Sequence, residues 1–460
     1  MSKLRFPKLS RRQLLGGALT LGAGAALSNP FSKNGFIQSA LAQGVPDTDR
    51  YFVFCYFSGG WDILISLDPK DPAIFREDLK KATRIQPGYQ LLPAGRRELV
   101  QTGIPGMTFG PFIGGLANHA EKMCVVRGIS MDTLTHEVGR RRFLTGKSPA
   151  GLQARGSSLG TVLAGQIGND TPIPNLSVRV EAYNADQADF ASAIRVTSVT
   201  DLVRALQVGN SSLGSIERQA INELFAQTRE CPIDELSAVR QRSYEAGLSA
   251  QDLVARGLSP LFDFSANTPQ MQAIRDHYNI DPDDLASGEA QAAMAVTALE
   301  AGISRCVSIE AAKDLDAHGP TWAAGHGPKL ERGFNLVAAL IEDLDSRQYL
   351  NTGDTWLDHT TIVCFSEFSR APLVNASGGR DHSLTNACML MGAGINGGTV
   401  VGASSDLGMA PTPTNYLTGV SEVGGSIIKP ENIHRALLQS IGIEEDIVDW
   451  RADPLSSILS

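Results

Sequence analysis

Polar side chains that could bind a metal ion follow several apolar runs of the sequence, at the points where these runs end. The six candidates, carboxylates and imidazoles from four separate stretches, are Asp62, Asp316, His318, Glu367, Asp381 and His382. Taken singly, each is typical of a helix cap or a turn. If they converge, however, a divalent cation relieves the repulsion between them. A mixed set of oxygen and nitrogen ligands suits Zn²⁺, Mn²⁺ or Fe better than Ca²⁺, which prefers oxygen alone.

A second candidate is the segment that begins at Thr135 and His136. It has the pattern of a helix N-terminus, because Thr135 can cap the first turn, and Arg140 follows soon after. A helix start with guanidinium groups is a good receptor for phosphate or sulfate. The alternative interpretation is a capped surface helix with a solvated basic patch.

Six short apolar runs, rich in β-branched and aromatic residues, predict the strands that would position these side chains. They are Tyr51–Phe57, Met123–Arg127, Leu176–Val180, Cys306–Ile309, Thr361–Phe365 and Ala387–Met391. Continuous apolarity is typical of strands buried on both faces, as in a parallel sheet. Residues 330–344 have helical spacing and lead into the strand at Thr361, which is a helix-to-strand step of a doubly wound α/β fold. Ligands of such sheets bind beyond the carboxyl ends of the strands.

Residues from about 185 to 300 have a different pattern. The stretches with helical spacing are Asp201–Val208, Ser215–Thr228, Asp234–Gly247 and Glu289–Ala301, and no convincing strand lies among them. We interpret this segment as a helical insertion in a single α/β domain that covers residues 43–460.

The first 42 residues predict export. Residues 10–15 (SRRQLL) are a twin-arginine motif, the weakly apolar run 16–27 follows, and residues 40–42 (ALA) resemble a cleavage site. The run is too short to be a membrane anchor, since a span needs about 20 residues; a basic tail is the other alternative. We expect a signal peptide, the twin-arginine translocase as partner during export, and a periplasmic or secreted protein. Because the tail before residue 42 is long, an uncleaved leader remains an alternative.

The charge of the chain argues against some partners. The formal net charge is −9, and without the leader, which has no acid, 34 basic residues face 49 acidic ones. Such a surface is unlike that of proteins that bind nucleic acid or anionic lipid. No later run is long enough to span a membrane.

Five of the six scattered cysteines lie inside apolar stretches, which favours buried free thiols over disulfides.

These motifs resemble those of the bacterial exported family called domain of unknown function 1501. The matching segments are 57–62 (FSGGWD), 316–318 (DAH), 366–370 (SEFSR), 379–382 (GRDH) and 391–394 (MGAG). They occur in family order across nearly the whole mature chain. The family is similar to the alkaline phosphatase and sulfatase superfamily. The resemblance implies an alkaline-phosphatase-like sandwich, with a mostly parallel central sheet and helices on both faces, and a metal-dependent hydrolase ancestry.

The resemblance also implies a role for each metal-site candidate. Asp62 would be the metal carboxylate of the first strand, and Asp316 and His318 would be the middle ligands. Glu367 stands where the superfamily has an aspartate, and His382 would be the late histidine.

Residues 136–149 (HEVGRRRFLTGKSP) resemble the nucleophile element of sulfatases. Counting back from its Thr-Gly pair places His136 where the nucleophilic cysteine or serine would be, and Arg140 on the supporting arginine. Since His136 has neither hydroxyl nor thiol, the usual covalent route is in doubt. Thr135 could serve by a one-residue shift, or His136 itself could act as nucleophile, general acid or metal ligand.

Two functions are therefore predicted. The first is an exported, metal-dependent hydrolase of phosphate or sulfate esters, in which Arg140 or Arg370 holds a small anionic ester substrate. The alternative is a non-catalytic exported protein that keeps the fold as a binding or assembly module. The missing nucleophile at His136 motivates this alternative.

Overall fold

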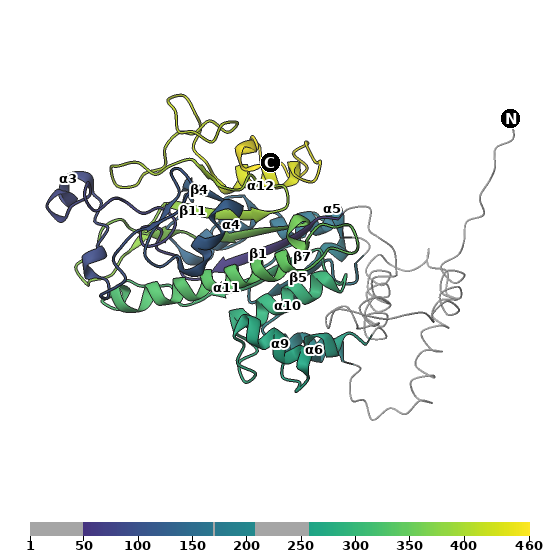
Figure 1. Cartoon of the computed structure of the whole chain (residues 1–460). Helices are drawn as coiled ribbons and strands as arrows, with labels where there is room; N and C mark the ends of the chain where they lie inside the picture. Colours follow the sequence, from purple (N-terminus) through teal and green to yellow (C-terminus); the bar gives the residue numbers. More distant parts are fainter. Residues whose placement is uncertain (1–48, 169–170, 208–256) are drawn as a thin grey trace, which may run out of the picture. The chain divides into compact units, whose positions relative to one another are not determined.

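An eight-stranded sheet forms the centre of the computed structural model, which describes residues 49–168, 171–207 and 257–460 (Figure 1). In their order across the sheet, the strands are β12 (Thr399–Val401), β4 (Met123–Ser130), β11 (Thr385–Gly392), β8 (Thr360–Phe365), β1 (Tyr51–Phe57), β7 (Cys306–Ala312), β5 (Asn175–Val178) and β6 (Ile194–Val196). β11 runs antiparallel to both of its neighbours, and every other pair in this sheet is parallel. The chain is therefore an α/β protein with a mostly parallel central sheet.

The strand β1 shows why the central strands have continuous apolar sequences. All seven of its residues are buried. Its odd-numbered residues pack into one hydrophobic cluster and its even-numbered residues into another, because successive side chains of a strand point to opposite faces. Both faces of the sheet are therefore covered, as expected of parallel strands.

Helices cover both faces of the sheet. The buried side chains of α6 (Val199–Leu206), α9 (Pro269–Tyr278), α10 (Gly288–Glu300) and α11 (Gly327–Ser346) belong to the first cluster. Those of α4 (His136–Thr145), α5 (Leu159–Ile167) and α12 (Pro430–Gln439) belong to the second. Figure 1 shows α11 and α12 on opposite sides of the sheet.

Short elements complete the described part of the chain. The strands outside the main sheet are β2 (Val100–Gln101), β3 (Thr108–Phe109), β9 (Ser369–Arg370) and β10 (His382–Ser383). The short helices are α3 (Lys80–Thr83), η1 (Glu77–Leu79), η2 (Tyr89–Leu91), η3 (Gly114–Lys122), η4 (Asp189–Ala191), η6 (Ser259–Phe262), η7 (Trp322–His326), η8 (Trp356–Asp358) and η9 (Ser456–Ile458).

All six predicted strands are present; Tyr51–Phe57 has the predicted bounds, and the bounds of the other five differ by a few residues. The predicted helix 330–344 is the centre of α11, and it leads into β8 as expected. The strands β6 and β12 were missed because runs of three residues are too short to give a pattern. The reversed direction of β11 was missed as well, since an apolar run gives no sign of its direction in the sheet.

The prediction of a strand-free helical insertion at 185–300 was wrong in two places. Residues Ile194–Val196 form β6, which pairs with β5 at the edge of the main sheet. The helix α10 packs against β7 and α11, so it belongs to a layer that covers the sheet. The predicted helices 215–228 and 234–247 lie outside the described residues.

The described residues belong to one compact unit, which covers Gly44–Ser460. The predicted leader, residues 1–42, lies outside the described residues. Within the part of the chain that the structure describes, no helix is both long and apolar enough to cross a membrane.

The prediction of buried free thiols is confirmed for the five described cysteines. Cys55, Cys124, Cys306, Cys364 and Cys388 each lie in a strand of the main sheet, and each is buried without a disulfide. Burial raises the pKa of Cys124 to about 11. These thiols therefore act as small apolar side chains of the core. The sixth cysteine, Cys231, lies outside the described residues.

Candidate metal centre

The candidate side chains meet at one edge of the main sheet. Parallel strands end at the same edge, so the loops that follow β1, β4, β7 and β8 come together there. These loops carry Asp62, His136, Asp316 and Glu367, respectively. His382 precedes β11, and because β11 runs in the opposite direction, its beginning lies at the edge where the other strands end.

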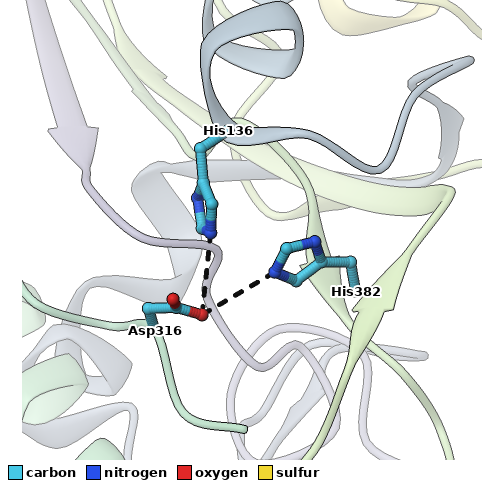
Figure 2. A group of neighbouring side chains, drawn as sticks. All are labelled: His136, Asp316 and His382. Atoms are coloured by element: carbon cyan, nitrogen blue, oxygen red, sulfur yellow. Dashed lines mark ion pairs between the residues drawn. The ribbon is translucent and has the colours of Figure 1, made fainter.

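Imidazole nitrogens converge on a single oxygen atom, Oδ1 of Asp316. The Nε2 atom of His136 lies 3.6 Å from this oxygen and that of His382 lies 3.7 Å away (Figure 2). The ligand atoms of these three residues all lie within 4.8 Å of one another. A third imidazole is close, since Nε2 of His318 lies 3.1 Å from the same oxygen and 2.9 Å from Nε2 of His382. The geometry is thus able to hold one cation.

The other nitrogens of His136 and His382 face hydrogen-bond acceptors. Nδ1 of His382 lies 2.5 Å from the carbonyl oxygen of Leu134, and a carbonyl oxygen can only accept. Nδ1 of His136 lies 2.8 Å from Oε1 of Glu367. In a neutral imidazole whose Nδ1 carries the proton, Nε2 has a free lone pair. Both rings therefore present a metal-ligating nitrogen to the centre of the group.

His318 is held in the same way. Its Nδ1 atom lies 2.8 Å from Oδ1 of Asp381, so the ionised carboxylate accepts its proton and Nε2 faces the group. The sequence predicted both Glu367 and Asp381 as metal ligands. The structure instead brings each carboxylate to the outer nitrogen of an imidazole, where it fixes the tautomer and orientation of the ring.

Glu367 is buried and its carboxylate is fully engaged. Besides His136, Oε1 accepts the backbone N–H of Gly59 at 2.9 Å, and Oε2 accepts the hydroxyl of Ser366 at 2.9 Å. Burial raises the pKa of Glu367, but the hydrogen bonds from His136, a backbone N–H and Ser366, together with the charge of His136, outweigh it, and the pKa lies below its usual value. The residue is therefore an ionised, fixed acceptor inside the protein.

Arg370 is the counter-ion of Asp316. Its buried guanidinium donates to Oδ1 of Asp316 at 2.7 Å and to the backbone oxygens of Gly59, Gly60 and Arg380. Burial raises the pKa of Asp316, but the hydrogen bond and charge of Arg370, with the charges of His136 and His318, outweigh it, and the pKa is lowered. Because these partners occupy the guanidinium, Arg370 is not the free anion receptor that the sequence predicted.

Apart from its imidazoles, the group has a net negative charge. The hydrogen bond from His318 lowers the pKa of Asp381, and burial lowers the pKa of His382, which favours a neutral ring at pH 7. Apart from the imidazoles, the three ionised carboxylates and one guanidinium leave two negative charges. A divalent cation would balance this charge.

Asp62 is buried but is not part of the group. Its Oδ1 atom accepts the backbone N–H of Leu64 at 3.0 Å. Its Oδ2 atom accepts the indole N–H of Trp322 at 2.7 Å and lies 3.1 Å from Nε of Arg380. Both side chains of the Asp62–Arg380 pair are 0% exposed. Asp62 thus ties the loop after β1 to the loop before β10, and the structure does not place it as the metal ligand that the family resemblance implied.

The glycine pair before Asp62 lets the loops at this edge approach closely. Gly59 has φ +108°, and a Cβ atom there would lie 2.7 Å from the backbone nitrogen of Leu315. A Cβ atom at Gly60 would lie 2.5 Å from the ring of Phe368. Side chains at either position would push the loop after β1 away from the loops that carry Asp316 and Glu367.

The helix α4 begins at His136, as predicted, with Thr135 as its N-cap residue. The Thr135 side chain makes no capping hydrogen bond, and its hydroxyl lies 3.3 Å from that of Thr133. Arg140 donates to Glu181 at 2.8 Å. The basic residue that was predicted to hold an anion is therefore paired with a carboxylate.

Two parts of the site were missed by sequence reasoning. The carbonyl oxygen of Leu134 orients His382, and no side-chain pattern marks a backbone acceptor. Asn375 donates to Asp381 and to the carbonyl oxygen of His318, each at 3.0 Å. An available signal was the short Asn-Ala-Ser-Gly-Gly run, because asparagine before glycines commonly organises a turn.

Comparison with known proteins gives a family and no named function. No curated protein matches the chain. A solved structure described as "Crystal structure of Ps i-CgsB" is 9% identical in sequence, and the match covers 86% of this chain and 73% of that one. Its TM-score of 0.36 is too low to support an inference. A family profile matches residues 49–418, which include every candidate residue of the site. The chain belongs to the family described as protein of unknown function (DUF1501).

Proposed function

We propose that the chain is an exported, metal-dependent hydrolase of phosphate or sulfate esters. One observation carries the proposal: the Nε2 atoms of His136, His318 and His382 surround Oδ1 of Asp316, while each Nδ1 atom has its own acceptor. This is the arrangement by which proteins prepare imidazoles as metal ligands. The Nε2 atom of His136 is buried and has no hydrogen-bond partner among the described residues, as expected of a nitrogen that binds a metal ion when the ion is present.

The donor set indicates the kind of metal. Imidazole nitrogens with one carboxylate oxygen suit Zn²⁺, Mn²⁺ or Fe²⁺, whereas Ca²⁺ prefers oxygen ligands. A bound divalent cation would supply Lewis acidity toward an ester oxygen. The protein's own contribution is orientation: Glu367 fixes His136 from the buried side, and Arg370 fixes Asp316.

An anionic ester is the proposed substrate for two reasons. The family resemblance points to the alkaline phosphatase and sulfatase superfamily, whose sandwich fold agrees with a mostly parallel sheet between two helical layers. In addition, the first residue of α4 is His136 itself, and the Thr135 side chain does not cap the first turn. The positive end of the helix dipole therefore lies beside the cation site, where both favour an anion.

Water is the proposed nucleophile. His136 stands where sulfatases have a cysteine or serine, and its Nδ1 is bound to Glu367 while its Nε2 faces Asp316. These contacts suit a metal ligand better than a nucleophile that forms a covalent ester. A one-step attack by water needs no hydroxyl at this position.

Metal content and hydrolysis together test the proposal. Protein purified without chelator should contain a divalent metal, lose stability when a chelator removes it, and hydrolyse at least one of an aryl phosphate, a phosphodiester and an aryl sulfate. The variants Asp316→Asn and His382→Ala should lose both metal and activity. Asp276→Ala is the matched control, because Asp276 is an exposed carboxylate of α9. Absence of bound metal, together with unchanged stability in chelator, would refute the proposal.

Export by the twin-arginine pathway is part of the same proposal. Replacing Arg11 and Arg12 by lysine should keep the protein in the cytoplasm, because the translocase recognises the arginine pair. The readout is the amount of protein in periplasmic and cytoplasmic fractions. Equal export of the wild type and the double-lysine variant would contradict this part alone.

One observation favours a non-catalytic metal-binding protein as the second candidate. Arg140 is paired with Glu181, and the guanidinium of Arg370 is occupied by Asp316 and by backbone oxygens, so neither predicted receptor is free for an ester anion. The two candidates differ in one result. If the protein binds metal at Asp316 and His382 but hydrolyses none of the three ester classes with Zn²⁺, Mn²⁺ or Fe²⁺, the second candidate is favoured.

A further inference from the structure

We propose that Asn375 and Asp381 form a positioning pair that holds His318 as the fourth ligand of the metal site. This inference rests on the proposed function, since it concerns the same cation. It changes the role of Asp381 from ligand to orienting carboxylate and gives Asn375 a role at the site, beyond the turn that its sequence pattern indicates. The site then has one carboxylate and three imidazole ligands.

The contacts of the pair lead directly to His318. Oδ1 of Asp381 lies 2.8 Å from Nδ1 of His318, so the carboxylate sets the direction in which Nε2 points. The side-chain amide of Asn375 donates to that same carboxylate oxygen at 3.0 Å. It also donates to the backbone oxygen of His318 at 3.0 Å. One side chain therefore fixes both the backbone of His318 and the group that orients its ring.

The loop 375–381 is built around Asn375. The side-chain oxygen of Asn375 accepts the backbone N–H groups of Ser377 at 2.9 Å and Gly379 at 3.0 Å. A Cβ atom at Gly379 would lie 2.3 Å from the backbone of His318, so only glycine permits this approach of the two loops. The backbone N–H of Arg380 donates to the carbonyl oxygen of Ala317 at 3.0 Å. The two loops are thus joined on both sides of His318.

The pair is needed because His318 lies on the solvent side of the group. The side chain of Glu367, which orients His136, is 1% exposed, and the packed protein interior fixes it. The side chains of His318 and Asp381 are 45% and 60% exposed, so little packing restrains this ring. Hydrogen bonds to Asp381 and Asn375 must therefore supply the restraint that burial supplies to His136.

Titration with Co²⁺ tests the inference. Loss of an outer hydrogen bond to a metal-ligating histidine typically lowers metal affinity about 10- to 100-fold. We expect Asp381→Ala and Asn375→Ala to lower Co²⁺ affinity by such a factor. The visible absorption of bound Co²⁺ should also weaken, because more than one water molecule can enter where His318 leaves, which raises the coordination number. Asp381→Asn, which keeps an acceptor oxygen, should lose less affinity than Asp381→Ala.

A double variant shows whether the effect passes through His318. If Asp381 acts only by positioning this ring, then Asp381→Ala should have no further effect on Co²⁺ affinity in a His318→Ala background. Asn415→Ala is the matched control for a disturbed loop. Asn415 also organises a turn, with its Oδ1 accepting the N–H groups of Leu417 and Thr418, but it is not among the residues that contact the site. This control should bind Co²⁺ with wild-type affinity.

The outcomes separate this inference from the proposed function. If wild-type protein binds no Co²⁺, the proposed function fails and the inference fails with it. A second outcome is that the wild type binds Co²⁺ and Asp316→Asn abolishes binding, whereas Asp381→Ala and Asn375→Ala keep wild-type affinity and absorption. In that case the proposed metal site stands, and only the positioning pair is refuted. Additive losses in the His318→Ala background would likewise refute the positioning role.

Discussion

Replacing Asp62 by asparagine should destabilise the fold and leave the proposed metal site in place. The family resemblance implies that Asp62 is a metal ligand, whereas the structure pairs it with Arg380, and both side chains are 0% exposed. Asparagine has nearly the same shape and keeps an oxygen for the N–H of Leu64. It removes the charge and the oxygen that accepts the indole N–H of Trp322, so the guanidinium of Arg380 is left buried without a counter-ion.

The size of the effect follows from this burial. Removing one partner of a buried ion pair typically costs about 3–5 kcal/mol, because the remaining charge stays desolvated. For a protein whose urea dependence is about 3 kcal/mol per M, the unfolding midpoint should fall by roughly 1–2 M. Arg380→Met should cause a loss of similar size, since it leaves Asp62 as the uncompensated charge.

The assay is urea unfolding in the presence of chelator, so that metal binding does not contribute to stability. The double variant Asp62→Asn with Arg380→Met removes both charges, and it should be more stable than either single variant. Asp449→Asn is the control, because the Asp449–Arg451 pair is 70% and 83% exposed, and its midpoint should not change measurably. If Asp62→Asn instead lowers metal affinity and leaves the midpoint in chelator unchanged, the structural role is refuted.

Three further predictions follow from the structure. Glu367→Gln should lower metal affinity about 10- to 100-fold, as measured by Co²⁺ titration, because a neutral amide orients His136 more weakly; wild-type affinity would contradict this role. Burial lowers the pKa of His434 from 6.5 to about 3. Between these two pH values the unfolded state binds more protons than the folded state, so the free energy of unfolding should fall as pH drops from 6.5 toward 3. This loss should be about 1.4 kcal/mol per pH unit for this residue and should be absent from His434→Gln, whereas equal slopes in urea unfolding would refute it. The five described cysteines should react with a thiol reagent only after unfolding, and rapid labelling of native protein in their peptides would show that they are accessible.

The sequence indicated the strands well because burial on both faces has a direct signature in composition. The run Tyr51–Phe57 has no charged residue, and the structure buries all seven of its side chains between two helical layers. The direction of β11 has no such signature. It depends on the path of residues 366–384, which turn back at the sheet edge through β9 and β10 instead of crossing over by a helix.

The sequence predicted which residues lie close together at the site, but it did not predict the role of each residue. His136, Asp316 and His382 come together as their places beyond the sheet edge suggested. A ligand and a carboxylate that orients it differ in position by a few ångströms, and residue type does not encode this difference. Glu367 was predicted as a ligand, whereas the structure places its carboxylate on the outer nitrogen of His136. Asp62 follows a strand as the others do, and only the fold reveals that Arg380, far along the chain, neutralises it.

The hydrogen bonds of the imidazoles also predict that binding of the proposed cation is linked to protonation of the rings. His318 and His382 both use Nδ1 as a donor, and yet their Nε2 atoms lie only 2.9 Å apart. Two lone pairs at this separation repel, so either a proton or a cation must lie between the rings. Arg370 already balances the charge of Asp316, which leaves Glu367 and Asp381 to be balanced by the same protons or by the metal. If the proposed cation binds here, protons and metal compete for one set of nitrogens, and we expect uptake of a divalent cation to release protons from the site.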